Sequence, residues 1–436
     1  MENCSPRLHD NRDSEASVQS AEPLTATTPP PERGQPGVAS PTRPDRFVTA
    51  ATTLFQDHGY RNVSMEQIGG AVGLTGPAVY RHFPSKQDIL ATALTTQVHT
   101  VRDFLSDAQD RGDTPVEQLG LFFDALSEMT AHRDASTLWN RERLHLSHAD
   151  LDTMNAYFGV LTDKLACKIC AARHDVDSMD AKLLATAALS VYSNAAQIRG
   201  SLTAKRLMKV QRAVTDSILG CELPRAPGPP VAQASHSRRS PAARRERILD
   251  AATQLFFDRG FRDVRIDEIA ARAGVSVTTV YQEYAGKTVI LGTVLRRGLE
   301  GLLSASIAAL DGSSRTDALD VLLGTFVEFS LSSNGRILAV ALRDAVYLPE
   351  ESRIALGRTA SDYTAEWTTA ILAQTPGLSI DDAKALEKSL AGFACEVISS
   401  PELRSRPGID SELRALAYGI LSPSGLSRSH PRRSAH

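Results

Sequence analysis

The stretch Ser64–Phe83, SMEQIGGAVGLTGPAVYRHF, decides the fold we expect for this chain. Its apolar residues form one short helical face, break at Gly73 and then form a second helical face. Ser64 with Gln67 has the pattern of a capping box at the start of the first helix, and Thr75 is expected to cap the second. This arrangement predicts a helix-turn-helix, in which the second helix enters the major groove of DNA while the first crosses the phosphate backbone.

The flanking segments extend this pattern. Residues 46–55, RFVTAATTLF, place their apolar side chains on one helical stripe, and Gly59 with Tyr60 ends that helix. The combined pattern F-x-x-A-A-x-x-L-F-x-x-x-G-Y and I-x-x-x-x-G-L-T-x-x-x-V-Y-x-H-F-x-S-K resembles the DNA-binding region of TetR-type transcriptional regulators. A three-helix core without a DNA role explains the apolar positions equally well, but the polar residues on the outer face favour DNA binding.

The same motif returns in the second half of the chain. Residues 248–256, ILDAATQLF, repeat residues 47–55, and the pairs Gly59/Gly260 and Tyr80/Tyr281 are both 201 residues apart. A weaker repeat at a spacing of 202 residues continues into the segments that follow. Two similar units of about 200 residues therefore replace the three domains that a length of 436 residues predicts.

We expect an all-α chain made of two tandem TetR-like units. In the family that the chain resembles, the helix-turn-helix domain precedes a helical domain that holds an effector pocket and a dimer interface, usually a four-helix bundle. The expected organisation is a disordered tail (1–42), a first helix-turn-helix domain (43–95), a first helical regulatory domain (96–220), a Pro-rich and basic linker (221–240), a second helix-turn-helix domain (241–295), a second helical regulatory domain (296–422) and a basic tail (423–436).

Composition limits the functions to consider. The net charge of −3 gives no global basic field, so a DNA footprint must be local. Because no apolar run reaches the ~18 residues of a transmembrane helix and the N-terminus lacks an apolar signal region, we expect a cytoplasmic protein with no membrane segment.

Catalytic and metal sites are not expected. Cys167 and Cys170 with His174 offer too few ligands for a zinc site. His145 and His148 with Glu142 lie on a charged segment, where such spacing usually describes a solvated helix face. The sequence has no P-loop, no G-x-S-x-G and no Rossmann fingerprint, so we expect neither an enzyme nor a bound cofactor.

The two copies differ where they are expected to meet DNA. Arg265 replaces Ser64 and cannot cap a helix with its side chain. Glu283 lies near the expected phosphates, where its charge is unfavourable unless it accepts from a cytosine amino group. Gly69 and Gly70 weaken the first helix of the first motif, unless small residues there let the two helices cross closely.

The TetR resemblance assigns DNA contacts position by position. In the first copy they are Ser64, Thr75, Gly76, Pro77, Ala78, Tyr80, Arg81 and His82, and in the second copy Ser276, Val277, Thr278, Thr279, Tyr281 and Gln282. The expected phosphate contacts are Arg43, Arg46, Lys86, Arg244, Arg245, Arg247 and Lys287.

The expected partners are double-stranded operator DNA and an unknown, apolar small-molecule effector. TetR-like proteins act as dimers, so the chain is either a homodimer or an intramolecular pseudo-dimer of its two halves, and we expect a repressor. Candidate pocket residues are Phe122, Phe123, Trp139, Phe158, Phe326, Phe329 and Trp367, which burial in a core explains equally well. The alternative is a ligand-binding or protein-interaction module in which one or both helix-turn-helix units are degenerate.

Overall fold

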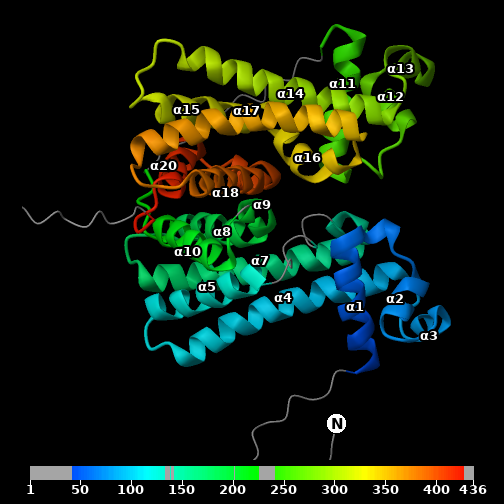
Figure 1. Ribbon diagram of the computed structural model, residues 1–436, viewed down its shortest axis with the longest axis horizontal. Helices are drawn as coiled ribbons and strands as arrows, with labels where there is room; N and C mark the ends of the chain where they lie inside the picture. Colours follow the sequence, from blue (N-terminus) through cyan, green and yellow to red (C-terminus); the bar gives the residue numbers. More distant parts are fainter. Residues whose placement is uncertain (1–41, 133–137, 139–141, 201, 225–240, 427–436) are drawn as a thin grey trace, which may run out of the picture. The chain divides into compact units, whose positions relative to one another are not determined.

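The computed structural model describes residues 42–132, 138, 142–200, 202–224 and 241–426. The description that follows concerns the unit Arg43–His436. Most of the predicted N-terminal tail, linker and basic tail lies outside the described residues. Within the described ranges every regular element is a helix, which confirms the all-α prediction (Figure 1).

The first half begins with three shorter helices and continues with longer ones. Its α-helices are α1 (Arg43–His58), α2 (Met65–Ala71), α3 (Gly76–Tyr80), α4 (Lys86–Arg111), α5 (Pro115–His132), α7 (His148–Ala172), α8 (Ser178–Ser193), α9 (Ala195–Arg199) and α10 (Ala204–Leu219). Two short 3-10 turns are η1 (Tyr60–Asn62) and η2 (Arg143–His145).

The second half repeats this order. Its α-helices are α11 (Arg244–Arg259), α12 (Ile266–Ala273), α13 (Val277–Glu283), α14 (Lys287–Leu310), α15 (Ala318–Leu331), α16 (Arg336–Asp344), α17 (Glu350–Gln374), α18 (Ile380–Ser399), α19 (Pro401–Arg404) and α20 (Ile409–Leu421). Its 3-10 turns are η3 (Ser333–Gly335) and η4 (Ala345–Tyr347).

The proposed borders between the helix-turn-helix and regulatory domains fall inside continuous helices. α4 runs through the border at residues 95 and 96, and α14 runs through the border at 295 and 296. In α4 the buried residues Leu94, Val98 and Leu105 carry one apolar stripe across the border, so nothing interrupts the helix there. Each long helix therefore belongs both to a helix-turn-helix unit and to the bundle behind it.

Local sequence sets the ends of the short helices. The Ser64 hydroxyl accepts from the backbone N–H of Gln67 at 3.2 Å, and the Gln67 side chain accepts from the N–H of Ser64 at 2.7 Å, which confirms the predicted capping box. Thr75 occupies the N-cap of α3, but the prediction that its side chain caps the helix is wrong. Pro77 has no N–H to donate, and the N–H of Ala78 is bonded to the Thr75 carbonyl at 2.9 Å.

Close helix crossing explains one of the two glycines in α2. A Cβ added to Gly69 would lie 2.9 Å from the carbonyl oxygens of Leu74 and Thr75, so the chain after the turn passes too close for any side chain. A Cβ added to Gly70 would meet nothing within 4 Å. The expectation is therefore confirmed for Gly69, and Gly70 has no such contact.

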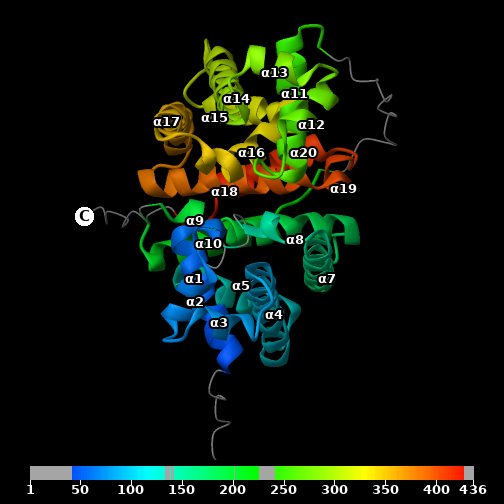
Figure 2. The same cartoon turned by 90° about the vertical axis from the view of Figure 1, so that its right-hand side faces the viewer.

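The two halves share one hydrophobic core, while each helix-turn-helix unit has its own. α8 and α10 of the first half pack against α18 and α20 of the second, and α8 lies beside α18 in both views (Figures 1 and 2). Where α10 crosses α20, a Cβ added to Gly419 would lie 3.4 Å from the Ser217 carbonyl oxygen. Ser217 and Gly419 are 202 residues apart, so equivalent positions of the two copies meet at this crossing.

Two ion pairs cross the shared core reciprocally. Arg206 Nε donates to Asp382 Oδ1 at 2.7 Å, and Arg406 donates to Asp180. Asp180 and Asp382 are the third residues of α8 and α18, 202 residues apart. Burial alone would raise the pKa of Asp382, but hydrogen bonds from Arg206 and Ser379 outweigh it and hold that pKa below its usual value.

Candidate nucleic-acid interface

The first recognition helix, α3, presents a polar face to solvent. Tyr80 is 53% exposed, and the exposed residues around it are Thr75, Pro77, Arg81 and His82. Ala78 is half-buried, and Gly76 is buried against the Glu66 side chain, 3.1 Å from where a Cβ would stand. The structure thus brings most of the predicted contact residues of the first copy onto one surface.

The second recognition helix, α13, is similarly exposed but better capped. The Ser276 hydroxyl accepts from the N–H of Thr279 at 3.1 Å, and the two hydroxyls lie 2.9 Å apart. Tyr281 is 55% exposed, and Val277, Thr278 and Gln282 are exposed beside it. Its accessible groups therefore differ from those at α3, where Arg81 and His82 are exposed directly after the helix.

Lys86 and Lys287 have structural partners that the sequence did not suggest. Lys86 Nζ donates to the carbonyl oxygens of Val63 at 2.6 Å and Tyr60 at 2.7 Å, and it lies 4.4 Å from the centre of the Tyr60 ring. Lys287 Nζ donates to the Val264 carbonyl at 2.7 Å and lies 4.5 Å from the Phe261 ring centre. Each lysine ties the start of its long helix to the loop after the first helix, and its phosphate contact stays a prediction.

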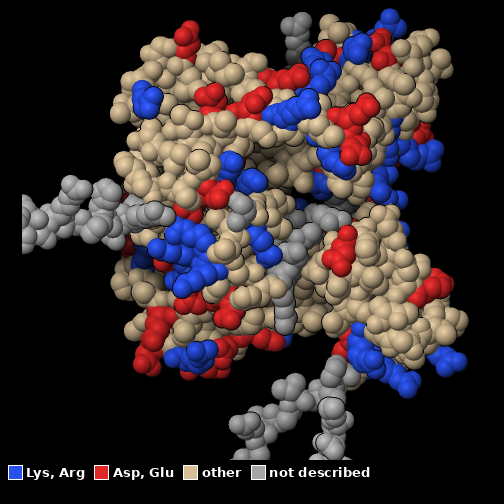
Figure 3. Space-filling view, viewed as in Figure 1, with Lys and Arg blue, Asp and Glu red and all other residues tan. Residues whose placement is uncertain are grey.

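The arginines of α1 and α11 occupy matching places. Arg46 donates to the Val72 carbonyl at 3.4 Å, and Arg247 donates to the Ala273 carbonyl at 3.1 Å, in both copies at the end of the first motif helix. Arg43 and Arg244 are exposed. Figure 3 shows basic side chains over the edge formed by α1–α3 and α11–α13, with acidic side chains among them.

Glu283 is close to a compensating charge. One of its carboxylate oxygens lies 4.0 Å from Arg245 NH1, and the Arg245 guanidinium also lies 5.0 Å from the centre of the Tyr284 ring. The negative charge that the sequence places near phosphates is therefore partly offset within the second unit. An arginine held by Glu283 is also less free to bind a phosphate itself.

The two helix-turn-helix units touch through the loops that follow α1 and α11. Arg61 NH2 lies 3.5 Å from Asp263 Oδ1, and both side chains are about half exposed. Exposed pairs of this kind contribute little to stability, so the contact limits the relative position of the units only weakly.

The turn η2 links the first helix-turn-helix unit to the bundle behind it. His145 stacks on Tyr60 with ring centroids 5.0 Å apart, and Gln87 Nε2 donates to the His145 carbonyl at 2.7 Å. Burial, with a contribution from the charge of Arg61, lowers the pKa of His145 to about 4, although the charge of Asp263 works against this. His145 is therefore neutral at pH 7.

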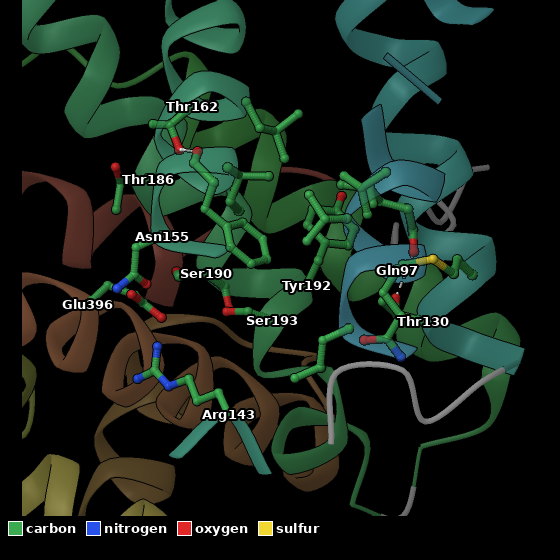
Figure 4. Close-up of a pocket in the computed structure, with 18 residues that line it drawn as sticks. Gln97, Thr130, Arg143, Asn155, Thr162, Thr186, Ser190, Tyr192, Ser193 and Glu396 are labelled. Carbon is green, nitrogen blue, oxygen red and sulfur yellow. Dashed lines mark hydrogen bonds between the residues drawn. The ribbon is translucent and has the colours of Figure 1, made fainter. Parts of the chain in front are cut away.

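A cavity of about 250 Å³ lies between α4, α5, α7 and α8 of the first half. Figure 4 shows Arg143, Asn155 and Glu396 turned toward one another at one end of it. Glu396 belongs to α18, so the second half completes the wall of a cavity in the first. Most of the remaining lining is apolar and includes Leu94, Val98, Met129, Phe158, Leu161 and Leu189.

Sequence reasoning found little of this cavity. Of the aromatic candidates, Phe158 lines it, Phe122, Phe123, Phe326 and Trp367 are buried in the shared core, Phe329 packs against that core, and Trp139 lies outside the described residues. The missed signal was polarity on a buried helix, because Thr186, Ser190 and Ser193 recur at helical spacing along the otherwise apolar α8. No sequence pattern could have paired Glu396 with Arg143.

Other kinds of site find no support in the described part of the chain. No three His, Cys, Asp or Glu side chains gather there as metal ligands, and Cys167 is exposed while Cys170 is half-buried. None of the helices in the described ranges combines the length and apolar character needed to cross a membrane.

Comparison with known proteins gives a consistent result. The family model described as "Bacterial regulatory proteins, tetR family" matches residues 47–93 and 248–294. The HTH-type transcriptional activator FasR of Mycolicibacterium smegmatis is 28% identical over 195 residues, which cover 43% of this chain and 86% of that protein. The HTH-type transcriptional repressor KstR2 of the same organism is 32% identical over 96 residues, which cover 22% of this chain and 47% of that protein.

The chain is also similar in part to solved structures. A TetR-family transcriptional regulator from Bordetella parapertussis 12822 is 20% identical with a TM-score of 0.38, over 41% of this chain and 95% of that one. The two matched regions coincide with the two helix-turn-helix units described above. The chain therefore carries the DNA-binding region of the TetR family of helix-turn-helix transcriptional regulators twice, in tandem.

Proposed function

We propose that the chain is a ligand-responsive repressor whose two halves act as an intramolecular pseudo-dimer on one operator. The observation that carries this is the reciprocal pairing of Arg206 with Asp382 and of Arg406 with Asp180 across a shared core. Asp180 and Asp382 are equivalent positions of the two copies, and each binds an arginine of the other half, as expected at a two-fold interface between subunits. A single chain then supplies both recognition helices that a palindromic operator normally requires from two subunits.

The operator we propose has two unlike half-sites. α3 offers Tyr80, Arg81 and His82, whereas α13 offers Thr278, Tyr281 and Gln282. Arginine commonly pairs with guanine and glutamine with adenine, so the two helices are suited to different base pairs. The DNA contacts assigned from the sequence are part of this proposal, with Lys86 and Lys287 in a structural role as well.

Repression and a response to a ligand complete the proposal. The cavity in the first helical domain supports ligand binding, and a ligand that prefers one arrangement of the halves would shift the spacing of the recognition helices. KstR2 is named a repressor and FasR an activator, so relatives of both kinds exist. A reporter gene behind the bound operator separates them, because a repressor lowers its expression and an activator raises it.

The first test is the selection of genomic fragments bound by the intact protein, followed by a salt titration on the best site. We expect the best site to contain two unlike half-sites and to bind one chain. We also expect log K to fall with log salt more steeply than the phosphate contacts of one helix-turn-helix unit would give. A stable dimer that pairs like halves in analytical ultracentrifugation would refute the pseudo-dimer. Absence of any bound site at low salt would favour a binding module with degenerate helix-turn-helix units.

A further inference from the structure

The strongest unexplained feature is the composition of the cavity in the first half. Among its lining residues the charged side chains are Arg143 and Glu396, which turn toward each other beside Asn155 (Figure 4). Burial disfavours the charged form of each, and each partner's charge opposes that effect in the other. When both side chains are ionised, their opposite charges cancel in the net charge of the cavity lining.

This charge balance selects the polar group of a ligand. An ionised carboxylate near Arg143 would also face Glu396, and an ammonium near Glu396 would also face Arg143. An uncharged hydroxyl, carbonyl or amide meets no repulsion, and it can exchange hydrogen bonds with the pair and with Asn155. The apolar side chains along the rest of the cavity then suit a hydrocarbon body.

Cavity size limits that body. A cavity of ~150 Å³ in another protein holds benzene, so a volume of about 250 Å³ corresponds to a ligand on the order of ten non-hydrogen atoms.

The second half has larger side chains at the matching helix positions. Tyr363 and Trp367 stand 202 residues after Leu161 and Leu165, and both aromatic side chains are buried in the shared core.

The cavity is connected to one DNA-binding unit through the turn η2. Arg143 begins this turn and lines the cavity, while His145, two residues later, stacks on Tyr60 of the first helix-turn-helix unit. In the second half, Tyr347 of η4 stacks on Phe261 with ring centroids 5.6 Å apart, so that turn also contacts its unit. Ala345 stands there in the place of Arg143, however, and provides no charged group to sense a ligand.

We propose that each chain binds one small amphipathic ligand with an uncharged polar head at Arg143 and Glu396, and that η2 transmits this binding to the first helix-turn-helix unit. The proposal rests on the ligand response proposed above and makes it asymmetric. Glu396 lets the second half sense the same ligand through α18, so the cavity is a site shared by both halves.

The test uses the full chain and three probes of similar size, 1-octanol, octanoate and octylamine, in isothermal titration calorimetry at pH 7.5. We expect 1-octanol to bind with one site per chain and roughly tenfold tighter than either charged probe, because each charged probe meets one like charge in a buried site. Hydrogen exchange with 1-octanol present should change in peptides covering Tyr60–Asn62 and Arg143–His145, and not in those covering Ala345–Tyr347. No operator is needed for either measurement.

Variants test the site directly. Leu161→Tyr should abolish binding of 1-octanol by filling the cavity, whereas the control Val160→Tyr, at a neighbouring position that is 56% exposed, should leave it unchanged. Glu396→Gln should tighten octanoate roughly tenfold relative to 1-octanol, because the like charge is gone. This second variant keeps the side-chain volume, so it remains informative if Leu161→Tyr does not fold.

Several results would overturn the proposal: a charged probe that binds tighter than 1-octanol, no binding of any probe, two sites per chain, or exchange changes at η4 instead of η2. Failure of the proposed function has a different signature. In that case 1-octanol binds and η2 responds, but no operator is selected or operator affinity does not change with the probe.

Discussion

Removal of Arg206 should weaken the contact between the halves more than removal of an arginine within one half. Asp382 is only 1% exposed and receives hydrogen bonds from Arg206 at 2.7 Å and from the Ser379 hydroxyl at 2.6 Å. Loss of one partner of a fully buried pair costs ~3–5 kcal/mol. Because the Arg206 side chain is 31% exposed, water can replace part of its interaction, and we expect Arg206→Met to cost about 2 kcal/mol.

Two further variants separate the charge from the packing. In Arg206→Met/Asp382→Asn the unpaired buried charge is gone while a side-chain oxygen remains for the Ser379 hydroxyl, so at least half of the lost stability should return. Arg212→Met is the control, because Arg212 pairs with Asp124 and Asp216 of its own half, which are 65% and 60% exposed. We expect that control to lose less than about 1 kcal/mol.

The assay is native-state hydrogen exchange in peptides from the first turns of α18, since a chain with several cores need not unfold in one step. Arg206→Met should lower the opening free energy there, and Arg212→Met should not. Equal losses in the two single variants, or a double variant no more stable than Arg206→Met, would show that the buried charge does not hold the halves together.

Three other predictions concern the first helix-turn-helix unit. Gly69→Ala should destabilise it by roughly 1–3 kcal/mol, because the new Cβ would lie 2.9 Å from backbone oxygens. The Cβ of Gly70→Ala would meet nothing within 4 Å, so this variant should be neutral or stabilising by up to about 1 kcal/mol. Thermal unfolding of the two variants compares their stabilities. Lys86→Met should lower the melting temperature without DNA, through loss of donors to the carbonyls of residues 60 and 63, and an unchanged value would leave the lysine a phosphate contact only. The pKa of His145 is about 4 in the folded chain, against an ordinary value of 6.5. Between these two pH values the unfolded chain binds more protons than the folded one, so the free energy of unfolding should fall as the pH drops from 6.5 to 4. His145→Phe should remove up to about 3 kcal/mol of this pH dependence, measured by acid denaturation.

The helix-turn-helix units were predictable because their signals are local. Ser64 and Gln67 lie one helical turn apart, and Gly73, with a φ of 74°, sits where a tight turn needs a positive φ. The constant spacing between the copies then predicted the second unit from the first. Even so, Thr75 lacks the expected side-chain cap, because the N–H of Ala78 donates to the Thr75 carbonyl and not to its hydroxyl, a choice that a pattern of residue types does not reveal.

Long-range partners could not be predicted in the same way. Lys86 looked like a phosphate contact because its other partners, the carbonyls of Tyr60 and Val63, are backbone groups that no residue pattern marks. The reciprocal ion pairs escaped for a related reason. Asp180 and Asp382 keep a spacing of 202 residues, but Arg206 and Arg406 are 200 residues apart, so the repeat does not align the partners.

Duplication within one chain explains why the site can be asymmetric. In a homodimer every interface residue occurs twice, so a glutamate placed in one cavity must also appear in the other. Here Asn194 stands in the first copy where Glu396 stands in the second. A Cβ added to Gly392 would lie 2.7 Å from Asn194 Nδ2, whereas Ser190, the counterpart of Gly392, lines the cavity together with Glu396. One side of the α8–α18 crossing is therefore closed by packing and the other is open to a ligand, a division that two identical subunits related by an exact two-fold axis could not make.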